Sequence, residues 1–418
     1  MKKLLIYLQF LLLALTTSCQ DDVNYPENKR DNEHTSTTNE MKISIPEAIN
    51  IADAFFGQID NKPTRTSRTI RSLDVIVDNQ NKQTRATADT LFYLFNYEQG
   101  GFAVISADKR MAPILAISTE GNFALTDTLS NSGLALFVDN LNKIEANMPN
   151  LLNSIPYIPS LPNPIDPTFP TFETKIHKDI KPLLKHHPRN WAQHSGFNKY
   201  CPNSATLGVP AYVGCVPLAC SQIMSYFEWP TSYNGITLDW STINSISYPS
   251  NINCPDWLAQ FLYEVGTTLK AKYDYNGKLY TSVSADNIQK YFSNFGYSKL
   301  SEPISLTHSS ASSDLESAPL LVVGNGANGN EGHCWVIDGY LSYTVSGGTT
   351  SSGDLISSYS LYHCVWGWGG SNNGYFLWRD GTEVNTSPYN YEEHDKKESS
   401  SSYSFTNLKY FRNFEPLK

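Results

Sequence analysis

The chain has 418 residues, of which 40% are hydrophobic and 17% are charged. This length predicts two domains rather than one small module, and this composition excludes a chain that is disordered throughout. With 31 Lys and Arg against 40 Asp and Glu, the formal net charge is −9, which excludes a broad basic surface for binding nucleic acid.

The first 18 residues are predicted to be an export signal, because Lys2 and Lys3 precede an apolar run at 4–15. No later stretch approaches the roughly 18 uninterrupted apolar residues of a membrane-spanning helix. The stretch LTTSC resembles a bacterial lipobox, which implies lipid attachment at Cys19, and the acidic residues after it resemble the export signal of Bacteroidetes surface lipoproteins. An ordinary cleaved signal peptide is the alternative. We expect a lipoprotein of the outer membrane or cell surface, or a secreted form released from it, with no other membrane contact.

A polar tether and a small first domain follow the leader. Residues 19–43 carry few large apolar groups, as a tether would. In the segment 44–56, Ser44 or Pro46 marks a helix start and the apolar residues recur at helical spacing. Strands are expected at 91–97, 100–108 and 112–118. These elements predict a helix-plus-sheet domain over 44–154.

A linker separates this domain from the second one. Six prolines lie between positions 155 and 170, so this stretch is predicted to be extended. The basic stretch 173–189 is expected to be exposed and to offer cut sites to a protease. We place the linker and activation region at 155–179 and the second domain at 180–418.

Beyond Cys19, the cysteines show no CxxC pair and no repeated zinc-ligand spacing. They are Cys201, Cys215, Cys220, Cys254, Cys334 and Cys364. No metal and no cofactor are therefore expected. Because the chain is long enough to fold without disulfides, most of these cysteines are expected to be free thiols.

The segment GCVPLACSQIMSYF at 214–227 is predicted to be a helix with one buried face, because apolar or small residues recur at helical spacing. Cys215 lies at its start, where the helix dipole and unpaired amides favour the thiolate and lower the thiol pKa. Pro217 fits the first turn of a helix, and Gly214 allows a close approach of backbone or substrate. Cys220 lies in the apolar stripe and is interpreted as a core residue.

His333 is the candidate partner that a catalytic thiolate needs. It follows a glycine-rich loop at 324–332 and opens an apolar run typical of a strand. A histidine in this position is more often structural, so the residues alone leave both roles open.

Three blocks of the second domain resemble the streptopain-like (C10-type) cysteine peptidases, in the same order and at similar spacing. They are GCVPLACSQIM at 214–224, GHCWVIDGY at 332–340 and HCVWGWGGSNNGYF at 363–376. The first domain resembles the inhibitory propeptide of the same family. The resemblance implies an α+β fold, in which a papain-like peptidase domain with a helical subdomain and an antiparallel sheet or barrel subdomain follows a smaller α+β propeptide domain.

The resemblance also implies roles for individual residues. Cys215 would be the nucleophile, and His333 would form its ion pair and act as general acid. The Gln193 side chain, in a stretch NWAQHSGFNKYCP that also resembles the family, would bind the oxyanion together with the Cys215 N–H. Further positions support the site (Trp366, Gly332 and Gly214) or border the pocket for the second residue before the scissile bond (Ser284 and Ala285).

Val365 departs from the family pattern, which has an asparagine there that orients the histidine ring. Valine cannot accept a hydrogen bond from the ring Nδ1–H, so a backbone carbonyl or a water must do so, or the ring is held less firmly. We expect weakened rather than abolished activity.

Two cysteines lie beside these positions, Cys334 after the histidine and Cys364 before the valine. If His333 and Val365 face each other on neighbouring strands, strand alternation brings Cys334 and Cys364 together on the opposite face. A cross-strand disulfide and two buried free thiols are then both open. His363 is interpreted as structural.

The predicted function is hydrolysis of protein or peptide substrates by a secreted cysteine endopeptidase made as a zymogen. Its own first domain would block the cleft until the chain is cut between Pro170 and Arg189. One alternative is a weakened or inactive peptidase-like surface lipoprotein that binds protein or peptide, which Val365 favours. The other is a transferase that uses the same thiol for acyl exchange. The intact cysteine, histidine and glutamine argue against the inactive form, and no acceptor-binding feature supports the transferase.

Overall fold

The computed structural model describes most of the chain between Lys42 and Lys418. The described ranges are 42–60, 68–77, 90–109, 111–129, 173–247, 253–274, 279–325, 332–350, 353–377 and 408–418, with positions 134, 137, 138, 141 and 277. They belong to one compact unit. The predicted export signal at 1–18, the lipid site Cys19, most of the tether and the proline-rich stretch lie outside the described residues. None of the helices in the described ranges is long and apolar enough to cross a membrane.

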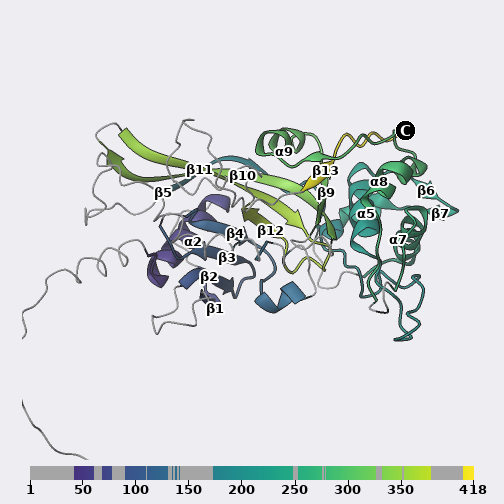
Figure 1. The fold of residues 1–418 in the computed structure, drawn as a ribbon, viewed down its shortest axis with the longest axis horizontal. Coiled ribbons are helices and arrows are strands. Elements are labelled where there is room, and N and C mark those ends of the chain that lie inside the picture. Colours follow the sequence, from purple (N-terminus) through teal and green to yellow (C-terminus); the bar gives the residue numbers. More distant parts are fainter. Residues whose placement is uncertain are drawn as a thin grey trace, which may run out of the picture. The chain divides into compact units, whose positions relative to one another are not determined.

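One antiparallel sheet joins the two predicted domains (Figure 1). The first domain contributes β1 (Ile70–Val77), β2 (Thr90–Tyr97), β3 (Phe102–Ser106) and β4 (Ile114–Ser118). The second contributes, in spatial order, β12 (Gly374–Leu377), β11 (Gly353–Val365), β10 (Gly332–Thr350), β9 (Leu320–Asn325), β13 (Lys409–Phe411) and β8 (Ile304–Ser305). At the junction of β4 and β12, Ile117 lies opposite Tyr375 and Ala116 opposite Phe376. The first domain is therefore paired directly with a strand of the second.

Helix α2 (Ile45–Ile59) forms where the spacing in 44–56 predicts it. Ser44 is its N-cap and accepts a hydrogen bond from the Glu47 backbone N–H, while the Glu47 side chain accepts one from the Ser44 backbone. Its buried face consists of Ala48, Ile51, Ala52, Phe55 and Phe56. Because this face packs on β3 and β5 (Glu173–Ile180), the helix ties the first domain to the start of the second.

The other α-helices whose bounds the structure describes belong to the second domain. They are α4 (His186–Arg189), α5 (Cys215–Phe227), α6 (Trp240–Ser245), α7 (Asp256–Thr268), α8 (Ala285–Tyr291) and α9 (His308–Asp314), with a 3-10 turn η3 (Phe292–Phe295) and a hairpin of β6 (Ser232–Tyr233) and β7 (Ile236–Thr237). The 3-10 turn η1 (Leu125–Leu129) belongs to the first domain. Figure 1 shows α5, α7 and α8 grouped beside β9 and β10. Helices beside an antiparallel sheet confirm the predicted α+β class.

Two hydrophobic cores lie on the two faces of the sheet. Cys334 and Val365 belong to the core built with α5 and α7. Trp335 and Trp366, their neighbours in the chain, belong to the core shared with the first domain. Strand alternation explains this division, because successive side chains point to opposite faces. The strand that carries His333 is thus packed by α5 on one face and by the first domain's core on the other.

Residues 173–179, predicted to be part of the linker and activation region, instead form strand β5 together with Ile180, the first residue of the predicted second domain. β5 pairs with the outer part of β10, from Tyr340 opposite Ile180 to Ser346 opposite Glu173. The basic residues that favoured a linker lie on its exposed side, while Thr174 is buried. Gln58 of α2 holds the strand, since its side chain donates to the Thr174 carbonyl at 2.8 Å and accepts from the Ile176 N–H at 2.9 Å. The predicted boundary at 180 therefore falls at the end of a strand.

Of the two alternatives left open for Cys334 and Cys364, a disulfide and two buried free thiols, the structure has the free thiols. All six described cysteines are free. Cys364 lies opposite Ile337, and Val365 lies opposite Val336 rather than His333, so the assumed register is three residues off. The two sulfurs therefore belong to cores on opposite faces of the sheet. Both thiols are buried.

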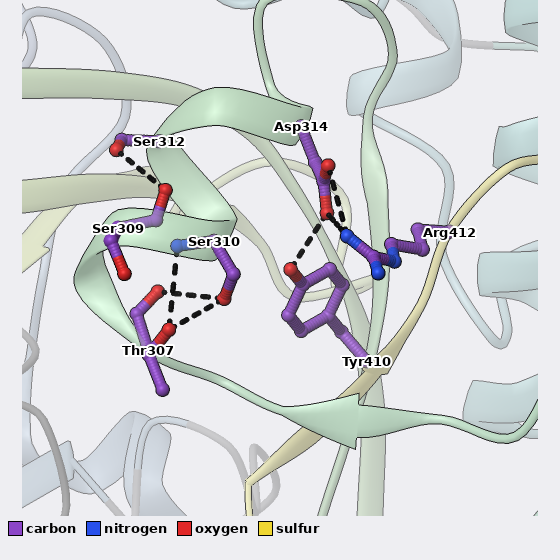
Figure 2. Close-up of polar contacts among 7 residues, drawn as sticks. All are labelled: Thr307, Ser309, Ser310, Ser312, Asp314, Tyr410 and Arg412. Atoms are coloured by element: carbon purple, nitrogen blue, oxygen red, sulfur yellow. Dashed lines mark hydrogen bonds and ion pairs between the residues drawn. The ribbon is translucent and has the colours of Figure 1, made fainter.

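Helix α9 fastens the strand near the C-terminus. Thr307 caps the helix by accepting a hydrogen bond from the Ser310 N–H. At the other end, Asp314 accepts from the Tyr410 hydroxyl at 2.7 Å and from Arg412 Nη1 at 3.0 Å (Figure 2). These contacts hold β13 in place beside β9.

Replacing Asp314 by alanine should lower the free energy of unfolding by about 1 kcal/mol, because a hydroxyl and a guanidinium both lose their partner and the ion pair is partly exposed. Urea denaturation of the full chain measures the effect. The matched control is Ser312→Ala, whose hydroxyl donates to the Ser309 carbonyl in an exposed turn and whose midpoint should stay near that of the wild type. Equal midpoints for the Asp314 variant and the control would contradict the role of this contact.

Candidate active site

A tight turn places Cys215 at the first position of α5. The helix is capped by Gly214, whose φ is 95°, a conformation that residues with side chains rarely adopt. A Cβ atom at this position would lie 2.9 Å from Thr281 Cγ2. Pro217 stands in the first helical turn, where its missing N–H leaves no helical bond unmade. The helix start predicted for Cys215 is therefore present.

Cys215 is partly exposed as a residue at this helix start, while its sulfur is buried. Burial of the sulfur raises the pKa of the thiol, while backbone N–H groups of Cys334, Val216 and Cys215 itself oppose that rise. The predicted lowering of this pKa is thus wrong for the structure described. The helix start and the three amides favour the thiolate, but their effect on the pKa is smaller than the effect of burying the charged sulfur.

The His333 side chain is buried and bonded to the backbone. Its Nε2 lies 3.3 Å from the Trp366 carbonyl oxygen. The ring stacks on Trp335, with centroids 5.9 Å apart and an interplanar angle of 16°, and it also contacts the Trp366 ring. Burial lowers the pKa of His333 from 6.5 to about 4, an effect that the bond to the carbonyl only partly offsets. The imidazole is therefore neutral at neutral pH.

Cys215 and His333 are neighbours without being an ion pair. Cys215 packs against the core that contains Cys334, the residue after the histidine, and the Cys334 backbone lowers the pKa of the Cys215 thiol. The described contacts nevertheless join the His333 ring to Trp366 and Trp335 and not to the sulfur. With the thiol pKa raised and the imidazole pKa lowered, both groups are in their neutral forms at neutral pH. The cysteine and the histidine therefore lie on adjoining elements with no ion pair between their side chains.

The Trp366 carbonyl takes the place of the amide that Val365 lacks. The sequence requires a backbone carbonyl or a water as the substitute, and the structure provides the carbonyl, with the bond made through Nε2 rather than Nδ1. Asn373, which sequence reasoning missed, supports this carbonyl. Its Oδ1 accepts from the Trp366 N–H at 3.1 Å, and its Nδ2 donates to the Arg189 carbonyl at 2.8 Å.

Gln193 is buried beside the helix start. Its backbone carbonyl accepts from the Val213 N–H at 2.9 Å, two residues before Cys215. Its neighbour Ala192 forms a bridge with Trp368. These pairings place the glutamine between the turn that carries the cysteine and the segment that follows Trp366.

The remaining predicted positions lie at the starts of a strand and a helix. Gly332 begins β10 opposite Asn325. Ser284 and Ala285 form the N-cap and first residue of α8, and Thr281 is the residue of that segment that lies against Gly214. The role of the pair in a substrate pocket stays a prediction.

Sequence reasoning missed a buried pair behind the site. Asp338 Oδ1 lies 2.6 Å from His363 Nδ1, and its Oδ2 accepts from the Leu184 N–H at 3.1 Å. The pair ties β10 and β11 to the segment that leads to α4, which gives the structural interpretation of His363 a physical basis. Among the described residues, no group of three or more His, Cys, Asp or Glu side chains is arranged to hold a metal ion.

A cysteine at the start of a buried helix, a histidine on the adjoining strand and a buried glutamine define a site of the cysteine peptidase class. Residues 191–376 match the peptidase C10 family, and residues 40–144 match the Spi protease inhibitor family. The chain therefore carries a C10-type peptidase domain preceded by an Spi-type inhibitor domain.

The chain is also similar to individual known proteins. Streptopain of Streptococcus pyogenes is 24% identical over 328 residues, which cover 68% of this chain and 73% of streptopain. The thiol protease/hemagglutinin PrtT of Porphyromonas gingivalis is 26% identical over 331 residues, covering 69% of this chain and 34% of that protein. A solved fragment of prointerpain A from Prevotella intermedia aligns with a TM-score of 0.48 and 20% identity, covering 82% of this chain and 98% of the fragment.

Proposed function

We propose that this protein is an endopeptidase made as an inactive precursor, with Cys215 as nucleophile and His333 as its proton acceptor and donor. The observation that carries the proposal is the packing of α5, which begins at Cys215, against β10, which carries His333. The strand that carries His333 lies against α5, and we propose that loss of the propeptide lets the ring leave Trp335 and approach the thiol.

The reaction follows from these positions. A His333 ring turned toward Cys215 takes the thiol proton, and the thiolate attacks the peptide carbonyl carbon to form a carbon–sulfur bond. The Cys215 N–H and the Gln193 amide hold the resulting oxyanion. His333 then gives its proton to the leaving amine as the carbon–nitrogen bond breaks, and water hydrolyses the thioester with the imidazole as base.

The propeptide is proposed to hold the histidine in its neutral, turned-away state. Support comes from two contacts with the segment after Trp366. The Asn122 N–H donates to the Ser371 carbonyl at 2.7 Å, and Asn372 Nδ2 donates to Asp127 Oδ2 at 2.7 Å. In addition, Phe102 and Phe137 of the propeptide pack on Phe376, which itself packs on Trp366. Loss of the propeptide removes the two rings that pack on Phe376, the residue that supports Trp366.

Replacing Gln193 by alanine should lower kcat of the propeptide-free enzyme by about 10²-fold and leave KM nearly unchanged, because the lost donor acts on the oxyanion. Steady-state kinetics on a fluorogenic peptide measure both constants. The control is alkylation of Cys215 by iodoacetamide, which forms no oxyanion and should proceed at the wild-type rate. An unchanged kcat would remove Gln193 from the proposed oxyanion site.

The function itself is tested by removing the propeptide through limited proteolysis and adding an epoxide-type thiol inactivator. Mass spectrometry then locates the adduct. Selective modification of Cys215, together with loss of peptide hydrolysis, is the expected result. Equal and slow labelling of all the thiols would instead favour the second candidate, an inactive surface protein that binds peptides, which the valine at position 365 favours.

We also propose that the chain acts at the cell surface, attached by a lipid on Cys19, or in a released form. The support is the sequence of the first 22 residues alone. Metabolic labelling with a fatty acid tests it: wild-type chain should carry the label and the Cys19→Ala variant should not.

A further inference from the structure

The residue after the candidate histidine faces the helix that begins at Cys215. Strand β10 packs on α5 (Figure 1). His333 stacks on Trp335, which belongs to the core on the face of the sheet away from α5. Because successive side chains of a strand point to opposite faces, Cys334 points the other way, into the core that α5 helps to build. In the described structure a thiol, and not the imidazole, is thus turned toward α5.

Three cysteines gather in this core. Cys334 and Cys220 are buried in it, and Cys215 packs against it. Their electrostatic interactions agree with this grouping. Burial raises the pKa of the Cys334 thiol, and the negative charges that Cys220 and Cys215 carry when ionised raise it further. Since such an effect weakens with distance, the three sulfurs lie within a short range of one another.

Only one of these thiols has a part in the proposed hydrolysis. Among the described cysteines none forms a disulfide, so Cys334 and Cys220 are reduced thiols held beside the nucleophile. Cys215 is the one of the three that is partly exposed, and an oxidant from solvent therefore reaches it first. An accessible, reactive cysteine with a second cysteine beside it is the arrangement of redox-sensitive thiols.

We propose that Cys334 is a resolving thiol for Cys215: a peroxide oxidises Cys215 to the sulfenic acid, and Cys334 then closes a disulfide that inactivates the enzyme reversibly. This proposal rests on the proposed function, because it needs the reactive thiolate that Cys215 forms once the propeptide has left. It makes the residue pair a modification site that protects the nucleophile from permanent oxidation.

The reaction balances with hydrogen peroxide as the oxidant. The Cys215 thiolate attacks one peroxide oxygen, the oxygen–oxygen bond breaks, and the departing hydroxide takes a proton to leave as water. The Cys334 sulfur then attacks the Cys215 sulfur and the sulfur–oxygen bond breaks. This second hydroxide takes the Cys334 proton and leaves as water. Two electrons pass from the two sulfurs to the peroxide, and a dithiol returns them by thiol–disulfide exchange.

The positions of the two cysteines favour the disulfide over further oxidation. A disulfide joins Cα atoms that are at most about 7 Å apart. Residues of α5 and β10 approach within 8 Å between Cα atoms, so a small movement closes the bond. Conversion of Cys215 to the sulfenic acid also removes one of the charges that oppose ionisation of Cys334. Sulfinic acid formation needs a second peroxide molecule, whereas Cys334 is already in place.

Peptide mapping of the oxidised protein tests the site directly. The full chain, before and after limited proteolysis removes the propeptide, is treated with hydrogen peroxide. Its remaining thiols are blocked with iodoacetamide, and unreduced peptides are analysed by mass spectrometry. After propeptide removal, the peptides that carry Cys215 and Cys334 should appear joined and two hydrogens lighter than their sum. The full chain should react more slowly, because burial raises the pKa of its Cys215 thiol.

Two mapping results would overturn the proposal. One is a sulfinic acid at Cys215 with Cys334 still reduced. The other is a disulfide between Cys334 and Cys220 that leaves Cys215 out.

Recovery of hydrolysis after treatment with dithiothreitol tests the protective role. Each protein is compared with its own untreated activity on a fluorogenic peptide. The wild type should regain nearly all of it, and Cys334→Ala should lose most of it permanently, because its sulfenic acid proceeds to the sulfinic acid. The matched control is Cys364→Ala, which removes a buried thiol in the core on the opposite face and should recover as the wild type does. Equal recovery of Cys334→Ala and the wild type would contradict the proposal.

The untreated protein separates this proposal from the proposed function. Hydrolysis before peroxide, together with the mapped disulfide, supports both. A disulfide between Cys215 and Cys334 in a protein that hydrolyses none of the peptides would support the modification site and contradict the peptidase. Hydrolysis that peroxide abolishes permanently, with no such disulfide, would do the reverse.

Discussion

Replacing Cys215 by alanine should abolish peptide hydrolysis by the propeptide-free enzyme. The expected loss in kcat is about 10⁶-fold, the size seen when the nucleophile of a serine peptidase is removed. The reason is that the remaining groups bind the substrate and the oxyanion but have nothing that attacks the carbonyl. Hydrolysis of a fluorogenic peptide after limited proteolysis measures the loss.

The matched control is Cys220→Ala, a second cysteine on the same helix. Cys220 is fully buried in the core beneath α5, and burial raises the pKa of its thiol. Its replacement should lower stability slightly and leave hydrolysis in place. If hydrolysis survives Cys215→Ala and disappears with Cys220→Ala, the nucleophile is Cys220 and the assignment to Cys215 is wrong.

Acid should selectively weaken the precursor through His333. The pKa of this ring is lowered from 6.5 to about 4 in the folded chain, so between these values the unfolded chain binds more protons than the folded one. The stability that the neutral ring contributes is therefore fully present above pH 6.5 and is lost as the pH falls toward 4. At full extent the effect is about 3 kcal/mol.

Urea denaturation of the full chain at pH 7.5, 6, 5 and 4.5 measures this dependence. The comparison is His333→Gln, which has a polar side chain of similar length and does not titrate. Other titrating groups affect both proteins alike, so the difference between their stability curves isolates the histidine. The wild type should lose more stability than the variant below pH 6.5. Parallel curves would mean that His333 is not buried in its neutral form.

The local features of the site are those that the sequence predicts well. Helix α5 follows from apolar spacing, and its start follows from Gly214 and Pro217, because both depend on residues that are adjacent in the chain. The first helix is predicted equally well from its cap at Ser44. The two further sequence blocks that resemble the family, at 332–340 and 363–376, then identify His333 and Trp366.

Features that depend on strand register could not be predicted. Val365 lies opposite Val336, and this pairing, set by packing across the whole sheet, separates Cys334 from Cys364. Residues 173–180 likewise became a strand because β10 is long enough to pair with them, which no local pattern reveals.

The electrostatics of the site were also beyond the sequence. A helix start favours a thiolate, but burial decides the thiol pKa of Cys215 in the described state, and burial comes from the fold. The contact between Trp335 and His333 could have been predicted, since a residue two positions after His333 on a strand shares its face. The ring contacts of Tyr212 with Trp368 and Tyr280 could not, because they join segments far apart in the sequence.

The central claim is that Cys215 and His333 become a thiolate–imidazolium pair only when the propeptide leaves. The pH dependence of Cys215 alkylation by iodoacetamide, measured by mass spectrometry before and after propeptide removal, tests it most directly. In the full chain the rate should keep rising through the alkaline range, because the thiol pKa is raised. After removal it should reach its plateau near or below neutral pH, as for a paired thiolate. Identical alkaline profiles in both forms would contradict the account.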